Sequence, residues 1–228
     1  MTGTDQRLPI IPLADVVHFP RTSLRIHVHE PRYRRLVRDL LTKDEETRLI
    51  GLVLVKPGHQ QPEERHRAIF PGGTAGQLVD FELLSDGRSN IVLEGRFRFV
   101  VRHEVGFEPY REAVIEPVEE PRYNNEDAGI QLVRTEILDL ASKLAKESPG
   151  RFPFDGEKLA DLRSRSSFEE VVNAVSAELD VPTLRKLQLL VASLPDRALN
   201  LLSILRARQR VLDLLRPFRP LADVADLN

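Results

Sequence analysis

The spacing of apolar residues changes once along this chain, near Glu120. Before that point short runs alternate apolar and polar side chains, as at Leu24, Ile26 and Val28, and this alternation predicts strands with one buried face. After it, apolar residues recur every three or four positions, which is the period of an amphipathic helix. Because no single kind of element fits both periods, the sequence predicts a β-rich part followed by a helical part.

The β-rich part contains a strong hairpin signal, Asp86-Gly87, between two apolar stretches. After this turn, Phe97 and Phe99 share one face of the expected strand, and the neighbouring arginines take the other. One helix is predicted here, and Pro31 suits its first turn. The strands are expected over residues 24–29, 49–56, 73–84 and 89–101, and a last one in the segment 110–120, where Pro117 is expected to end it.

Four helices are predicted in the second part of the chain. The first is expected to be capped by Asn125, and Ser167 with Glu170 fits the capping box of the second. The segment RFPFDG between these two helices is expected to be a loop, and the last helix to end near Arg216. Short breaks between the helices are typical of a bundle. We therefore expect a division into a β-rich part at 1–122, a helical bundle at 123–216 and a tail at 217–228.

Composition excludes several kinds of site. The chain has no cysteine, which removes disulfides, thiolate nucleophiles and cysteine-ligated zinc. Its 33 basic and 35 acidic side chains give a net charge of −2, which argues against a dedicated nucleic-acid binder. The N-terminus lacks the pattern of a signal peptide, and no window has the length of apolar residues that a membrane span needs. We expect a cytoplasmic protein with no membrane contact.

Motifs for catalysis and cofactor binding are missing from the sequence. The glycine-rich PGGTAG at 71–76 precedes an expected strand instead of a helix, and no Gly-Lys-Ser/Thr occurs, so neither nucleotide fingerprint is satisfied. No Gly-x-Ser-x-Gly elbow is present either. We therefore predict no catalytic residue, no cofactor and no enzymatic activity.

Histidines near the N-terminus raise the alternative of a metal site. His27 and His29 are two residues apart on an expected strand, so their side chains lie on the same side, as two zinc ligands would. His18 or Glu30 would have to complete the set. Because a solvated polar face gives the same pattern, we predict no metal site and keep a metal protein, or an unrecognised enzyme, as an alternative.

Several segments together carry a resemblance to a known family. LPIIPLADVVHFP, followed by IHVHEPRYRRLV, resembles the start of the Lon protease N-terminal domain family. The resemblance continues through IGLVLVKPG, through the segment from Gly73 to Val101, and through PYREAVIEPVEE. It extends to LQLLVASLPDRALNLLSILRARQRVL, so that it covers about Leu8 to Leu215.

The resemblance implies an α+β fold, with a β-rich PUA-like pseudobarrel as the N-terminal half and a C-terminal helical bundle. It also implies a role in recognising protein substrates. In Lon proteases this region precedes an ATPase module and a Ser-Lys peptidase module, and the sequence contains neither. No catalytic residue of the family is therefore carried over to this chain.

These observations lead to one preferred function and one main alternative. We expect a non-catalytic module that binds unfolded or apolar segments of protein partners, a separate protease or chaperone being another kind of partner, and that is a monomer or a weak homodimer. The alternative is a PUA-like nucleic-acid-binding protein using the arginines at 32–38, 96–102 and 206–219, although acidic residues follow the first group closely. The expected partner-binding residues, for which core packing is the competing interpretation, are Phe19, Tyr33, Phe70, Phe107, Tyr110, Phe152 and Phe154.

Overall fold

The computed structural model describes residues 6–58, 68–121, 123–147, 154 and 156–216. Contacts between Cα atoms divide the chain into two compact units, each assembled from two segments. The sheet unit consists of Met1–Pro121 with Val181–Ala192, and the helical unit consists of Arg122–Asp180 with Ser193–Asn228.

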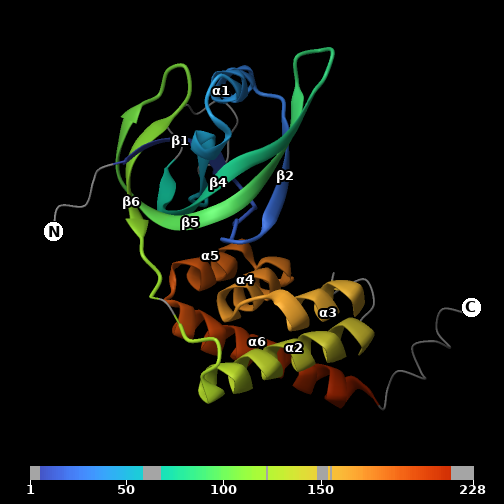
Figure 1. The fold of residues 1–228 in the computed structure, drawn as a ribbon. Helices are drawn as coiled ribbons and strands as arrows, with labels where there is room; N and C mark the ends of the chain where they lie inside the picture. The colour runs from blue at the N-terminus through green and yellow to red at the C-terminus, as the bar shows by residue number, and fades with distance from the viewer. Residues whose placement is uncertain (1–5, 59–67, 122, 148–153, 155, 217–228) are drawn as a thin grey trace, which may run out of the picture. The chain divides into compact units, whose positions relative to one another are not determined.

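Six strands of the sheet unit form one sheet that closes into a ring (Figure 1). Their order is β2-β5-β4-β3-β1-β6, and β6 pairs in turn with β5. The predicted fold class, with a β-rich barrel-like half and helices after it, is confirmed. The elements of the sheet unit are β1 (Gln6–Leu13), β2 (Ser23–Val28), α1 (Pro31–Leu41), the 3₁₀ helix η1 (Glu45–Thr47), β3 (Leu49–Val55), β4 (Ile69–Leu83), β5 (Ser89–Gly106), β6 (Glu112–Val118) and α5 (Thr183–Val191).

The long strand β5 changes partner at Gly95, which allows the sheet to close. Residues before Gly95 pair with β2, and residues from Arg98 onward pair with β6. The turn before β2 docks at this point, since Arg21 N donates to the Gly95 carbonyl at 2.8 Å and Gly95 N donates to the Thr22 carbonyl at 2.9 Å. A β-carbon at position 95 would overlap the carbonyl oxygen of Phe19, so only glycine fits here.

Helix α1 covers one part of the sheet and forms the first apolar core. Pro31 stands at its start, as predicted, and Tyr33, Leu36, Val37 and Leu40 are buried on one face. They pack against sheet residues that include Val28, Ile91 and Leu93. Burial of each leucine in such a core contributes roughly 1.5–3 kcal/mol. A second cluster, made of residues such as Ile10, Phe99 and Ile115, fills the ring.

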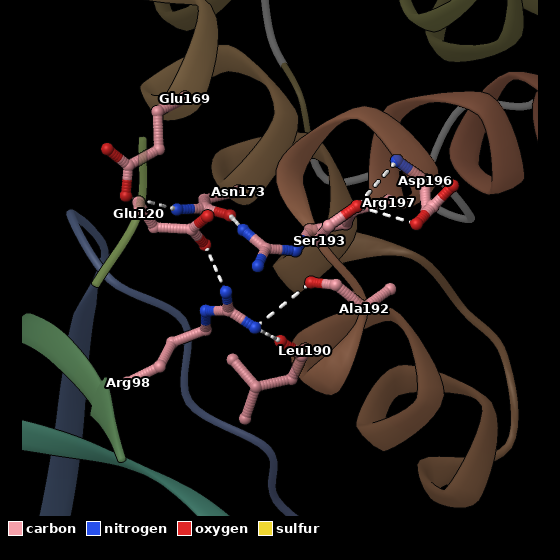
Figure 2. A network of polar contacts seen from close by, with 9 residues as sticks. All are labelled: Arg98, Glu120, Glu169, Asn173, Leu190, Ala192, Ser193, Asp196 and Arg197. Carbon is pink, nitrogen blue, oxygen red and sulfur yellow. Dashed lines mark hydrogen bonds and ion pairs between the residues drawn. The ribbon is translucent and has the colours of Figure 1, made fainter. Parts of the chain in front are cut away.

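Helix α5 belongs to the sheet unit, although the residues on either side of it belong to the helical unit. Gly72 of β4 permits this docking, because a β-carbon there would lie 2.6 Å from Cγ1 of Val191. Buried Arg98 of β5 fastens the helix: its guanidinium donates to the Leu190 carbonyl at 2.7 Å and to the Ala192 carbonyl at 3.0 Å (Figure 2). The predicted helical bundle at 123–216 included α5, because the spacing of apolar residues predicts a helix but does not show which unit the helix packs against.

The helical unit has its own buried polar pair and its own caps. Arg197 and Asn173 are both fully buried, and the Arg197 guanidinium donates to Asn173 Oδ1 at 2.6 Å, as Figure 2 also shows. The predicted capping box of Ser167 and Glu170 is confirmed. The described helices of this unit are α2 (Ala128–Glu147), α3 (Gly156–Arg165), α4 (Phe168–Glu178) and α6 (Leu194–Leu215).

Two predictions for the helical part were wrong. Asn125 does not cap the first helix: Asp127, directly before Ala128, accepts from Gly129 N at 2.9 Å and from Ile130 N at 3.1 Å. Asn125 Oδ1 accepts instead from Phe168 N at the start of α4, at 2.9 Å. The described chain also has five helices after residue 123, because α3 was missed. Its buried apolar residues are only Leu159 and Leu162, too few to make a clear stripe.

Candidate functional site

The β4–β5 hairpin extends beyond the end of β3. One edge of β4 therefore has no neighbouring strand there among the described residues. β3 pairs with β4 only as far as Leu49 opposite Gln77, and the last contact on that side is the bond from Leu78 N to the Arg48 carbonyl, 2.9 Å. Beyond it, β4 pairs with β5 alone among the described strands. Figure 1 shows this hairpin projecting at the upper right, beside α1. We call residues Val79–Leu83 the open edge.

Apolar side chains of the open edge are exposed. Val79 is 50% exposed, Phe81 42% and Leu83 58%. Phe81 lies opposite Ile91 of β5, which lies opposite Ile26 of β2, so these side chains share a face. Because Ile91 packs in the core beneath α1, Phe81 and Leu83 continue that core face beyond the part that α1 covers.

The opposite face of the same strands is polar and hollowed. Asn90 lies between two neighbours: its Oδ1 is 2.8 Å from His27 Nδ1, and its Nδ2 donates to Glu82 Oε2 at 2.8 Å. Asp80 and Arg25 lie on this face as well, on either side of Val92. A hollow of about 540 Å³ is lined by residues of β2, β4 and β5, among them these five polar side chains. The hairpin therefore carries an apolar face and a charged face.

The predicted turn at Asp86-Gly87 closes the hairpin. Gly87 has φ +80°, a conformation that glycine adopts without strain. Asp86 accepts from Arg88 N at 3.0 Å, and this hydrogen bond holds the pKa of its carboxyl below the usual value. Arg34 of α1 donates to the Asp86 carbonyl at 3.2 Å. The tip of the hairpin is thus bonded to α1, while the open edge beside it pairs with β5 on one side and with no described strand on the other.

The aromatic residues expected to bind partners are dispersed. Phe19 is fully buried and Phe154 is buried in the helical unit, while Phe70 and Phe107 are half-buried beside Lys56 and Arg111, respectively. Phe152 lies outside the described residues. Among the described members of this set, only Tyr33 and Tyr110 belong to the same apolar cluster, in which Tyr33 is buried and Tyr110 is partly buried at its edge. Burial raises the pKa of Tyr110, whose hydroxyl donates to Asp39 at 3.2 Å.

The three histidines considered as metal ligands occupy two environments. His27 and His29 stack on the surface with ring centroids 6.3 Å apart. His18 is buried, and desolvation lowers the pKa of its imidazole to about 4. Its Nε2 is buried without a hydrogen-bond partner. Within the described residues no group of three or more metal-ligating side chains comes together.

Acidic side chains accompany the arginines of the nucleic-acid alternative. Arg32 pairs with Glu30 at 2.7 Å, and Arg98 pairs with Glu120 at 2.5 Å. The same holds for Arg102 with Glu116, Arg206 with Glu136 and Arg216 with Glu147. Such pairing reduces the positive potential that phosphate binding needs.

A second exposed apolar surface lies on the helical unit. Leu132 of α2 is 73% exposed, and it lines an open hollow of about 900 Å³ together with Ala128, Thr135 and Leu140. The backbone N–H and C=O groups of α2 are hydrogen-bonded within the helix, so a partner could contact this surface through side chains alone.

Sequence reasoning missed the open edge, although a signal for it exists. The alternation Val79-Asp80-Phe81-Glu82-Leu83 predicts a half-buried strand, and the natural expectation is that its apolar face is covered. The signal is a difference in strand length: β3 has 7 residues, whereas β4 has 15 and β5 has 18. A short strand beside a long hairpin leaves part of the hairpin without a neighbour.

Known Lon proteases match between about two thirds and nine tenths of this chain. Lon protease of Flavobacterium johnsoniae is 26% identical over 208 residues, which cover 91% of this chain and 25% of that protein. Lon protease 2 of Sorangium cellulosum is 31% identical over 148 residues, 63% of this chain and 18% of that protein. The chain spans about a quarter of the length of the first of these relatives.

Solved structures support the fold. The N-terminal domain of Mycobacterium avium complex Lon protease superposes with a TM-score of 0.60 at 14% identity, covering 88% of this chain and 98% of that one. Among the described helices none is both long and apolar enough to span a membrane. The profile of the family described as the ATP-dependent protease La (LON) substrate-binding domain matches residues 7–207. This chain therefore belongs to the Lon substrate-binding domain family.

Proposed function

We propose that this chain is a non-catalytic module that binds unfolded or apolar segments of other proteins, and that the open edge is its binding surface. The observation that carries the proposal is the exposure of Phe81 and Leu83, which lie on the face of β4 that continues the core beneath α1. Neighbouring apolar side chains that are exposed to water on one face mark a surface for interaction with a partner. The family's description as a substrate-binding domain supports protein segments as the partner.

The seven aromatic residues contribute to this proposal unequally. Phe19, Tyr33 and Phe154 are buried, so they stabilise their own units in the unbound chain. Tyr110 packs against the core beneath α1 and is only half-buried, which leaves it available at the rim of that core. The open edge replaces these aromatic residues as the main candidate surface. The cytoplasmic location and the state as a monomer or a weak homodimer stay predictions.

A binding measurement with an unfolded protein tests the proposal. We expect reduced, carboxymethylated α-lactalbumin to bind the intact chain, and the double variant Phe81→Ser, Leu83→Ser to bind at least about tenfold more weakly, because the apolar contact is lost. Fluorescence anisotropy of the labelled unfolded protein measures both affinities.

The matched control is Leu132→Ser, which removes an even more exposed leucine from α2 of the helical unit. Circular dichroism confirms that each variant is folded. If the double variant binds as tightly as the intact chain, the open edge is not the binding surface. A loss of affinity with Leu132→Ser alone would assign the surface to α2.

A further inference from the structure

The backbone of the open edge presents hydrogen-bonding groups away from β5. Leu84 N donates to the Arg88 carbonyl at 2.9 Å, so these two residues form a hydrogen-bonded pair of the hairpin. In an antiparallel pair, bonded and non-bonded positions alternate. Phe81 opposite Ile91 and Leu83 opposite Ser89 are therefore non-bonded positions, and their N–H and C=O groups point to the open side.

A local contact supports this orientation. Phe81 N donates to Oδ1 of Asp80 at 2.8 Å, which places that N–H outside the β4–β5 ladder. Within the described residues no strand lies on the open side to accept from Leu83 N or to donate to the two carbonyls. An edge whose outward backbone groups have no strand partner, and whose apolar side chains are exposed, is a template for another extended chain.

The charged side chains beside the open edge indicate which kind of peptide segment can bind there. Both charged side chains of the edge, Asp80 and Glu82, are acidic, and they lie on the face opposite to Phe81. Further acidic side chains, Glu45 and Glu46, lie in η1, whose Glu45 carbonyl accepts from the Gln77 side chain at 2.9 Å. Two copies of this edge would bring carboxylates together, so self-pairing is disfavoured.

We propose that the open edge binds its partner by strand addition, and that the preferred partner is an extended segment in which apolar residues alternate with lysine or arginine. The segment adds antiparallel to β4 as a further strand of the sheet. Its apolar side chains cover Phe81 and Leu83, and its basic side chains lie on the face of Asp80 and Glu82. This inference rests on the proposed function and specifies how the same surface recognises its partner.

Backbone methylation of a short peptide tests the pairing directly. The probe is a capped peptide of alternating valine and lysine, with its valines opposite Phe81 and Leu83. In antiparallel pairing the valine N–H groups donate to β4, whereas the lysine N–H groups point away. Methylation of the valine nitrogens is expected to weaken binding by about tenfold or more, and methylation of the lysine nitrogens to leave it nearly unchanged.

Variants of the protein give a second, independent readout. Leu83→Pro removes an N–H that lies outside the β5 ladder, so the hairpin keeps its own hydrogen bonds while strand addition is blocked. Leu83→Val, which keeps an apolar side chain and the N–H, is the matched control. We expect the proline variant to lose about tenfold in affinity for the peptide and the valine variant to retain it. A peptide of alternating valine and glutamate is expected not to bind.

The outcomes separate this inference from the proposed function. In one outcome the unfolded protein binds the intact chain but not the Phe81→Ser, Leu83→Ser variant, and both methylated peptides bind as tightly as the unmethylated peptide. Strand addition is then wrong, and the apolar binding surface is still supported. If methylation of the lysine nitrogens alone abolishes binding, antiparallel pairing is wrong. If neither the unfolded protein nor any peptide binds, both proposals fail. Equal binding of the lysine and glutamate peptides overturns the charge preference.

Discussion

At the scale of single residues, His18 combines burial with a titratable side chain. Its Nε2 lies near the position that a β-carbon at Gly95 would take, 3.0 Å away, so the ring is packed against the point where β5 changes partner. The backbone around it is also fixed, since Thr74 donates to the His18 carbonyl at 2.7 Å. Protonation of this ring would place a positive charge in a site that has no carboxylate partner among its hydrogen bonds.

The stability of the chain is therefore expected to fall in mild acid. The pKa of His18 is about 4 in the folded chain and 6.5 when solvated, so the unfolded state binds the proton first as pH falls. The contribution of neutral His18 is complete above pH 6.5 and is lost progressively down to pH 4. The loss amounts to about 3 kcal/mol in the free energy of unfolding.

Urea titrations at several pH values between these limits measure the loss. His18→Gln removes the titrating group, so its free energy of unfolding is expected to change much less over this range, whatever its value at neutral pH. His27→Gln is the matched control for replacing a histidine, because His27 is exposed whereas His18 is buried. An unchanged slope in His18→Gln would contradict the assignment.

At the scale of elements, the attachment of α5 depends on one arginine. The Arg98 guanidinium donates hydrogen bonds to two carbonyls at the end of α5 and forms an ion pair with the half-buried Glu120, so its buried positive charge is stabilised. The orphan carbonyls at a helix end need such donors. The sequence placed Arg98 correctly on the face opposite to Phe99, but it offered no signal that α5 covers that face.

Removal of this anchor is expected to be costly. Arg98→Met leaves Glu120 without the guanidinium and deprives the end of α5 of its donors, which destabilises the fold by about 3 kcal/mol or more. Arg96→Met, two residues away on the same face of β5 and exposed, is expected to change the free energy of unfolding by less than about 0.5 kcal/mol. Chemical denaturation compares the two, and equal effects would show that the anchor is not needed.

The limits of sequence reasoning are also clearest at this scale. Strands β2 to β6, the hairpin turn, α1 and the capping box follow from period and turn chemistry, because each depends on neighbours in sequence, whereas β1 was not predicted from the period. Asn125 was assigned to the wrong helix since its partner, Phe168, lies 43 residues away. The open edge could not be read directly for a similar reason: whether Phe81 is covered depends on where β3 ends.

At the scale of the whole molecule, net charge and ion pairing argue against a nucleic-acid function. We expect a fluorescently labelled single-stranded RNA to show no rise in anisotropy with this chain even at low salt, because the net charge is −2 and arginines of each basic segment carry acidic partners. Binding that weakens steeply as salt rises would contradict this expectation and favour the phosphate-binding alternative.

The position of α5 in the chain has a consequence for the order of synthesis. The sheet unit needs Val181–Ala192, yet the ribosome makes all of Arg122–Asp180 before it reaches them. A nascent chain that ends at Pro121 has no α5, so Arg98 lacks its two α5 carbonyl acceptors and Val191 does not cover Gly72. The sheet unit is thus complete only after one of the last helices has been translated, and until then the face that α5 covers lacks its partner from the same chain.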